Sequence, residues 1–220
     1  MKLDPQFLAY AIPLLLRGAL VTVEFTIVSA FFGMLIGLVV ALARISRNPV
    51  LRSVSTAYVE FFRGTPLLVQ IFIIAFGLPA LLGDWANMPE FVAGVLALSI
   101  NSGAYTSEIF RAGIQSISRG QMEAGRSLGL SYAQTMWHVI IPQAVRVVVP
   151  PLGNELIALL KDSSLVSIIA VTDLMRAGRE ITGTTIRPFE TYTLVALLYL
   201  CMTLPLTLLV RAAERRMKTA

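Results

Sequence analysis

Lysine and histidine are scarce in this chain, and their scarcity excludes several kinds of chemistry. The three lysines are Lys2, Lys161 and Lys218, and none of them follows a glycine. No phosphate-binding loop of the form G-x4-G-K-[ST] can therefore exist, so the chain cannot hydrolyse ATP by itself. His138 is the only histidine and lies outside the expected spans, which excludes HExxH metal sites, multi-histidine metal binding and a Ser–His catalytic pair within the membrane. We expect no catalytic residue, no metal site and no cofactor in this chain.

Cysteine occurs only once, as Cys201 within an apolar segment. A single cysteine cannot form an intrachain disulfide, and we expect a buried thiol with a structural role. A cleavable signal pattern is also absent from residues 1–17. The first spanning helix is therefore expected to act as its own insertion signal.

Charged residues are few, at 14%, whereas apolar residues make up 56% of the 220 and the mean hydropathy is +0.75. This composition is typical of a polytopic membrane protein, and we expect one integral domain over residues 1–220. The net charge of +5 could attract nucleic acid, but no Lys/Arg run with interleaved aromatic residues is present. A bias of basic loops toward the cytoplasm explains the charge better.

The apolar pattern predicts an all-α integral membrane protein with five transmembrane helices. An interfacial segment over 5–17, interrupted by Pro13, is too short to cross about 30 Å of hydrocarbon. Pro150 and Pro151 should break the fourth span, and residues 163–171 should form a short re-entrant or broken helix after it. The expected spans are about 18–43, 65–82, 91–110, 142–160 and 191–210.

Two segments are expected to be loops. The arginine-rich segment 44–52 follows the first span, and RGTP, at residues 63–66, opens the second. Pro66 would fix the turn there, with Glu60 and Arg63 pairing at i,i+3. The other loop carries several charged side chains between residue 172 and the fifth span, namely Arg176, Arg179, Glu180, Arg187 and Glu190.

The third span carries a polar stripe. Asn101, Tyr105 and Glu108 fall at i, i+4 and i+7, which places them on one face of a helix. Such a face is expected to contact protein and not lipid.

A polar, helix-prone segment, QMEAGRSLGLSYAQTMWHVIIP, separates the third and fourth spans. Glu123-Ala124-Gly125 is followed after three residues by Gly129, and after nine more by Val139-Ile140-Ile141-Pro142. Gly129 is the point where the backbone can turn from one short helix into a second at 131–138. The alternative is an ordinary amphipathic helix lying on the membrane surface.

This spacing resembles the EAA loop of ATP-binding-cassette (ABC) importer permeases, with mild changes at Gly125, Val139 and Ile141. RGTP, INSGAY at 100–105 and PPLGNE at 150–155 resemble segments of the polar amino acid branch, in the family's order. The resemblance implies a cytoplasmic coupling helix within 121–138, with Glu123, Ala124, Gly125 and Gly129 contacting an ATPase.

The resemblance also implies the partners and the cofactors of the complex. Two membrane subunits would form the pathway, the second being this chain or a paralogue. Two ATP-binding subunits would hold ATP and Mg²⁺, and an extracytoplasmic solute-binding protein would deliver the amino acid at the bacterial inner membrane. The contrasting hypothesis is an ion-coupled carrier or channel without an ATPase, which often has inverted repeats; the two halves here show no convincing repeat.

Basic residues predict the orientation, with the N-terminus outside and the C-terminus in the cytoplasm. Twelve of the eighteen would then be cytoplasmic: Arg44, Arg47, Arg52, Arg63, Arg111, Arg119, Arg126, Arg146, Arg211, Arg215, Arg216 and Lys218.

The predicted substrate site lies where the third span meets the fourth, with Asn101, Glu155 and Asp162 as contacts. Glu155 and Asp162 are seven residues apart and share a helix face if the helix continues that far. A carboxylate inside a bilayer needs a cation, either from the substrate or from a protein base such as Lys161 or a partner-subunit arginine. Two carboxylates favour cationic amino acids over glutamine-like ones.

Overall fold

The computed structural model describes residues 4–218, and within that range the chain is helical, without any strand. The predicted all-α class is confirmed for these residues, whereas Lys2 lies outside them. Four short helices of other types lie between the α-helices. Ile73–Gly77 and Met136–Ile140 are π-helices, and Asp84–Ala86 and Ser163–Ile169 are 3-10 helices. The α-helices are α1 Pro5–Ile45, α2 Pro49–Gly64, α3 Leu67–Phe72, α4 Leu78–Leu82, α5 Glu90–Gln115, α6 Arg119–Ser127, α7 Tyr132–Thr135, α8 Ile141–Asp162, α9 Leu174–Thr185 and α10 Pro188–Lys218.

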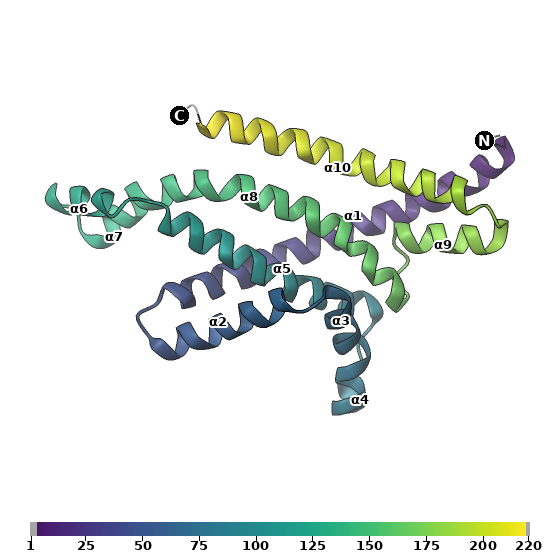
Figure 1. The fold of residues 1–220 in the computed structure, drawn as a ribbon, viewed down its shortest axis with the longest axis horizontal. Coiled ribbons are helices and arrows are strands. Elements are labelled where there is room, and N and C mark those ends of the chain that lie inside the picture. Colours follow the sequence, from purple (N-terminus) through teal and green to yellow (C-terminus); the bar gives the residue numbers. More distant parts are fainter. Residues whose placement is uncertain (1–3, 219–220) are drawn as a thin grey trace.

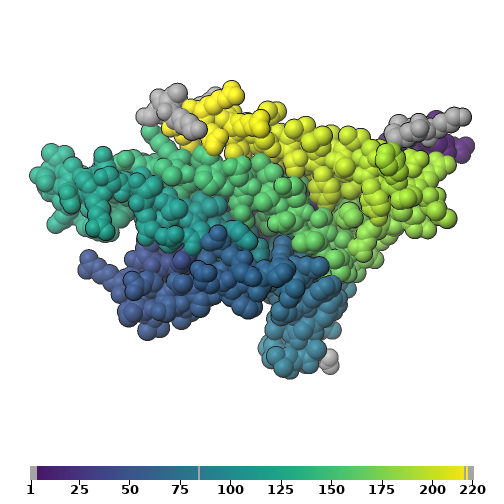
Figure 2. All heavy atoms as spheres, in the orientation of Figure 1, coloured from purple at the N-terminus to yellow at the C-terminus, as the bar shows by residue number. Residues whose placement is uncertain are grey.

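The long helices lie side by side along the longest axis of the molecule (Figure 1). Helices α6 and α7 stand at one end, and the segment around α4 projects from the body in Figure 2. Among the described helices, α1 and the stretch Pro188–Arg215 of α10 are long and apolar enough to cross a membrane, with mean hydropathies of 2.5 and 2.2. The segments Pro49–Gly64 and Leu67–Leu82 would add one broken span, bent by 107°.

Helices α1 and α5 approach closely because small residues face each other. Gly33 and Gly37 of α1 lie against Ser102 and Thr106 of α5, and a Cβ atom on Gly37 would collide with Thr106. The Thr106 hydroxyl donates a hydrogen bond to the Gly33 carbonyl at 3.0 Å. Lipid tails are as apolar as side chains, so packing of this kind holds membrane helices together in place of the hydrophobic effect.

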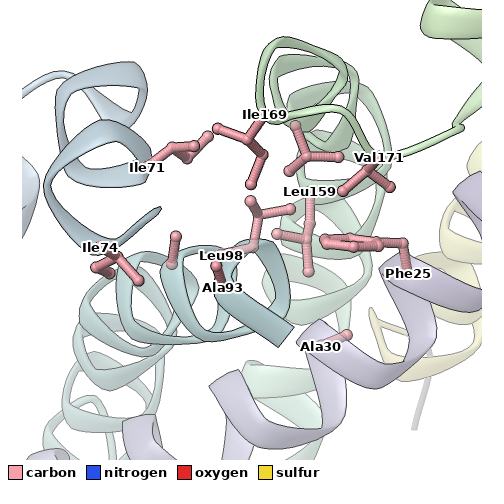
Figure 3. Close-up of a cluster of buried hydrophobic side chains, with 11 residues drawn as sticks. Phe25, Ala30, Ile71, Ile74, Ala93, Leu98, Leu159, Ile169 and Val171 are labelled. Atoms are coloured by element: carbon pink, nitrogen blue, oxygen red, sulfur yellow. The ribbon is translucent and has the colours of Figure 1, made fainter. Parts of the chain in front are cut away.

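A buried cluster joins five parts of the chain (Figure 3). Phe25 of α1, Ile71 of α3, Leu98 of α5 and Leu159 of α8 meet there with Ile169, and each is at most 3% exposed. The cluster fixes α8 against α5, which positions the polar residues described below.

The expected boundary between an interfacial segment at 5–17 and a span at 18–43 is absent, because α1 runs unbroken through Pro13. Proline at this position removes one main-chain hydrogen bond. Tertiary packing compensates, since Phe7, Ala11 and Leu15 are all buried in a cluster with α9 and α10.

Both expected loops contain helices. Residues 49–64 form α2, whose Asn48 side chain caps the first turn and whose Ser55 and Val59 are buried. The charged segment after residue 172 contains α9, because Leu174, Ala177 and Ile181 form a buried face at helical spacing. Neither segment is apolar enough to resemble a membrane span. Their charged residues therefore favour loops when only the sequence is considered.

Two further expectations were wrong. Helix α8 continues through Pro150 and Pro151 and is not broken there. Cys201 is exposed and not buried, because α10 packs along a narrow strip and exposes most of its apolar surface.

Candidate functional site

Glu155 of α8 is the central polar residue of an apolar cavity. The cavity has a volume of about 280 Å³ and lies between α1, α5 and α8, where Met34, Ser102, Thr106 and Leu156 also line it. Ser102 donates its hydroxyl hydrogen to Glu155 Oε1 at 3.0 Å. This contact places one carboxylate at the junction of α5 and α8, although Ser102 does not belong to the predicted polar stripe of Asn101, Tyr105 and Glu108.

Glu155 has no basic partner in the part of the chain that the structure describes. Neither Lys161 nor any described arginine forms an ion pair with it. The hypothesis that Lys161 neutralises Glu155 is therefore not supported by the geometry. Glu155 is partly buried, and a hydroxyl group compensates such a carboxylate only partly, so the cavity is suited to a cationic group.

Asn101 points away from this cavity. Its amide nitrogen donates to Gln70 Oε1 at 2.9 Å and more weakly to the Phe62 carbonyl at 3.4 Å. Gln70 in turn donates to the carbonyl of Phe62 at 2.9 Å. Asn101 thus satisfies the open main chain where α2 meets α3, and its neighbour Ser102 reaches the cavity instead. Ser102 and Thr106 were missed in the sequence because small hydroxyl residues in apolar helices give a weak signal.

Asp162 is the last residue of α8 and is exposed to the surroundings of the isolated chain. It does not line the Glu155 cavity. The structure brings Glu155 together with Ser102, whereas Asn101 and Asp162 do not line the same cavity.

Glu108 is the acceptor in a group of ion pairs that joins α1, α2 and α5. Arg44 contacts Glu108 Oε1, Arg111 Nη2 lies 2.7 Å from Oε2, and Arg63 Nη1 lies 3.7 Å from Oε1. Arg63 also covers the Tyr105 ring at 5.3 Å. The predicted pairing of Arg63 with Glu60 is wrong, because the Arg63 side chain lies against Glu108 and Tyr105 of α5 instead.

Asp173 is a fully buried carboxylate and caps α9. Its side chain accepts the Arg176 N–H at 2.9 Å, while Thr22 of α1 accepts the Leu174 N–H at 3.1 Å. Burial raises the pKa of Asp173 to about 6, against the opposing effect of the main-chain N–H groups and Arg179. Asp173 therefore caps α9, and the neighbouring Leu174–Thr22 hydrogen bond joins the start of α9 to α1.

Helices α6 and α7 form the bent pair that Gly129 predicts. Gly129 has φ +85°, and the main-chain N–H groups of Gly129 and Leu130 donate to the carbonyls of Arg126 and Gly125, each at 3.1 Å. Ser131 then starts α7 with a reciprocal capping box to Gln134. A left-handed residue after the first helix and a cap before the second fix the angle between them.

Gly125, which stands in place of the usual second alanine, has a packing reason. A Cβ atom there would collide with Thr135 of α7, and both residues are buried in the contact between the two helices. The glycine therefore matches the threonine opposite it.

The outer surface of this pair carries unpaired and apolar side chains. Glu123 and Ala124 are exposed, and Glu123 forms no ion pair with any described residue. Leu128, Tyr132 and Trp137 are 83%, 61% and 69% exposed. A protruding surface of this composition is suited to contact with another protein.

No set of three His, Cys, Asp or Glu side chains within the described residues is placed to hold a metal ion. The chemistry on offer is therefore binding by carboxylate, hydroxyl and apolar groups.

Comparison with known proteins gives matches over most of the chain. Residues 33–219 match the family described as binding-protein-dependent transport system inner membrane component. The glutamine transport system permease protein GlnP of Escherichia coli is 41% identical over 218 residues, which cover 99% of each chain. The arginine transport system permease protein ArtQ of Bacillus subtilis is 39% identical over 219 residues, covering 100% of this chain and 99% of ArtQ.

Solved structures show the same arrangement of helices. A crystal structure described as an amino acid ABC transporter with histidines contains a chain that is 44% identical, with a TM-score of 0.90, and covers 98% of this chain and 100% of that one. An inward-facing MetNI methionine ABC transporter is 23% identical, with a TM-score of 0.77, and covers 93% of this chain and 96% of that one. The second likeness supports the fold alone.

Proposed function

The chain belongs to the family of binding-protein-dependent transport system inner membrane components, and from this we propose that it forms the membrane pathway of an ATP-driven importer for a polar amino acid. Like its relatives, it is a membrane permease subunit. It is not an enzyme. The observation that carries the proposal is similarity over the whole length to amino acid permeases at 39–41% identity. No observation favours an ion-coupled carrier or a channel.

The proposed partners follow from the family. Two ATP-binding subunits hold ATP and Mg²⁺, a second membrane subunit completes the pathway, and an extracytoplasmic binding protein delivers the substrate. The exposed surface of α6 and α7, with Glu123, Ala124 and Leu128, docks on an ATPase. Closure of the ATPase pair moves this surface, and α5 and α8, which are joined to it, transmit the movement to the pathway.

Five spans are proposed for the membrane topology, with α5 and α8 as the third and fourth. Both are polar enough to require protein neighbours, which Asn101, Glu108 and Glu155 obtain from α1, α2, α3 and α5. Twelve basic residues would lie in the cytoplasm, together with α6 and α7.

The orientation can be tested with single cysteines at Arg47 and Asn87 in a Cys201→Ala background. Both positions are exposed. Position 87 is preferred to the adjacent Ala86, which is only 7% exposed, because a cysteine there would react poorly with a thiol reagent in either orientation. An impermeant thiol reagent added outside intact cells should label position 87 and leave position 47 unlabelled until the membrane is opened. The reverse labelling pattern would invert the proposed topology.

Glu155 is proposed to bind a cationic group of the substrate, with Asp162 near the mouth of the pathway and Asn101 as a support for the α2–α3 junction. The relatives named above transport glutamine and arginine by their descriptions. The unpaired carboxylate in an apolar cavity favours arginine, lysine or histidine here.

Glu155→Gln should lower arginine uptake relative to glutamine uptake by about tenfold or more, because a hydrogen bond to a charged group contributes about 1.5–3 kcal/mol. Uptake of both labelled amino acids would be measured in vesicles holding the complete transporter and its binding protein. Glu90→Gln, an exposed carboxylate at the start of α5, serves as the control. An unchanged rate and ratio in Glu155→Gln would remove Glu155 from the substrate site.

A further inference from the structure

The ion-pair group around Glu108 contains more positive than negative charge. Three arginines, Arg44, Arg63 and Arg111, surround one carboxylate, which leaves a surplus of two positive charges. The Arg44 side chain is 13% exposed and Arg111 is 32% exposed, whereas Arg63 is 44% exposed. Unbalanced charge beside apolar helices is costly in a membrane protein unless an anion is supplied.

Arg63 is the most exposed of the three arginines, and its side chain has unused hydrogen-bond donors. Its closest nitrogen is 3.7 Å from Glu108 Oε1, beyond hydrogen-bond distance, and that oxygen already accepts from Arg44. Its guanidinium rests on the Tyr105 ring, and it donates no hydrogen bond to any residue between 4 and 218. Arg111, in contrast, donates to Glu108 and Gln115 at 2.6–2.9 Å. Contact with Tyr105 and Glu108 therefore holds the Arg63 guanidinium in position, while its N–H groups remain available to another ligand.

The surroundings of Arg63 are apolar and open. Helix α2 buries Ser55 and Val59 and exposes Val50, Val54 and Phe61, the last at 54%. Phe61 lies two residues before Arg63, so the two side chains project from different sides of the end of α2. A lipid at this helix end can meet the guanidinium with its head group and the exposed apolar side chains with its hydrocarbon.

We propose that Arg63, supported by Arg44 and Arg111, binds the phosphate of an anionic phospholipid. A guanidinium fork matches two phosphate oxygens, and its planar group remains charged in apolar surroundings. A lipid with an uncompensated phosphate neutralises the surplus, whereas a choline lipid brings its own cation. Basic pockets between membrane helices bind anionic head groups for the same reason.

The test uses the complete transporter in bilayers of equal parts phosphatidylglycerol and phosphatidylcholine, followed by detergent extraction and mass spectrometry of the retained lipid. The wild type should retain phosphatidylglycerol preferentially. Arg63→Gln should lower that preference about fivefold, which corresponds to one arginine near a membrane surface. Arg63→Lys keeps the charge without the fork and should give an intermediate value. Arg52→Gln, also exposed on α2 but in no ion pair, should resemble the wild type.

Four results would overturn the proposal. An unchanged preference in Arg63→Gln would exclude Arg63 as the binding group. An equal loss in Arg52→Gln would indicate general surface charge, and displacement of the retained lipid by millimolar inorganic phosphate would indicate a site for free phosphate. If Arg63→Gln instead releases an ATPase subunit while the lipid preference persists, the surface serves a protein partner. Size-exclusion profiles of all variants establish that each complex remains assembled.

Discussion

Replacement of Glu108 by alanine should lower the apparent melting temperature of the purified protein by about 6–12 °C. The reason is that Arg44, Arg63 and Arg111 would remain close together without their shared carboxylate. Removing one partner of a largely buried ion pair costs about 3 kcal/mol or more, and each kcal/mol moves the melting temperature by about 2–4 °C in a chain of this size. The loss arises mainly from repulsion and poor solvation of the arginines left behind.

Glu60→Ala is the matched control for this measurement. Glu60 is a glutamate like Glu108, and it lies near the end of α2. It is exposed and forms no ion pair with a described residue. Its replacement should change the melting temperature by about 1–2 °C at most. A Glu108→Ala protein as stable as the control would show that the ion pairs do not hold α1, α2 and α5 together.

Gly129→Leu should abolish transport while the protein still inserts and assembles. A leucine at φ +85° costs about 1–2 kcal/mol in backbone strain, so α6 and α7 would relax to a different angle. A docking surface displaced by even about 1 Å can lower a coupled rate by about 100-fold. Binding-protein-stimulated ATP hydrolysis and uptake in vesicles would both be measured.

Gly83 provides a close control, because it has φ +90° and an equally open surrounding but lies beside α4, away from α6 and α7. Gly83 also has ψ −173°, a backbone region essentially restricted to glycine, so Gly83→Leu should carry at least as much strain as Gly129→Leu and still retain transport. Gly129→Asn should recover much of the activity, since asparagine tolerates a left-handed backbone. Glu123→Arg should reproduce the loss without any strain, because Glu123 is exposed. Normal transport in both Gly129→Leu and Glu123→Arg would contradict docking through this surface.

The parts of the fold that could be predicted from the sequence are those with a local cause. Gly129 and Ser131 specify the bend and the second helix by backbone geometry and capping, and α5 follows from one long apolar run. The continuity of α1 through Pro13 and the formation of α9 depend on packing between distant segments, which no local pattern reports. The charged residues of α2 and α9 favour loops in the sequence, although each helix buries an apolar face.

The candidate site divides in the same way. Glu155 could be recognised because a carboxylate in an apolar run requires a reason. Asn101 was predicted to share its cavity, but residue 101 faces Gln70 while residue 102 faces Glu155. One residue corresponds to a rotation of about 100° around a helix, and only the packing of α5 against α3 and α8 fixes which residue faces which neighbour.

The two prolines in α8 make its stiffness uneven. Pro150 and Pro151 supply no N–H groups, so the carbonyls of Arg146 and Val147 lose their usual partners in the helix. Helices bend first where consecutive main-chain bonds are missing. This compliant stretch lies between the end of α8 that joins α7 and the turn that carries Glu155. A push applied at the α7 end therefore reaches Glu155 as a change in the bend of α8, with the Glu155 half still held in place by Leu159 in the core.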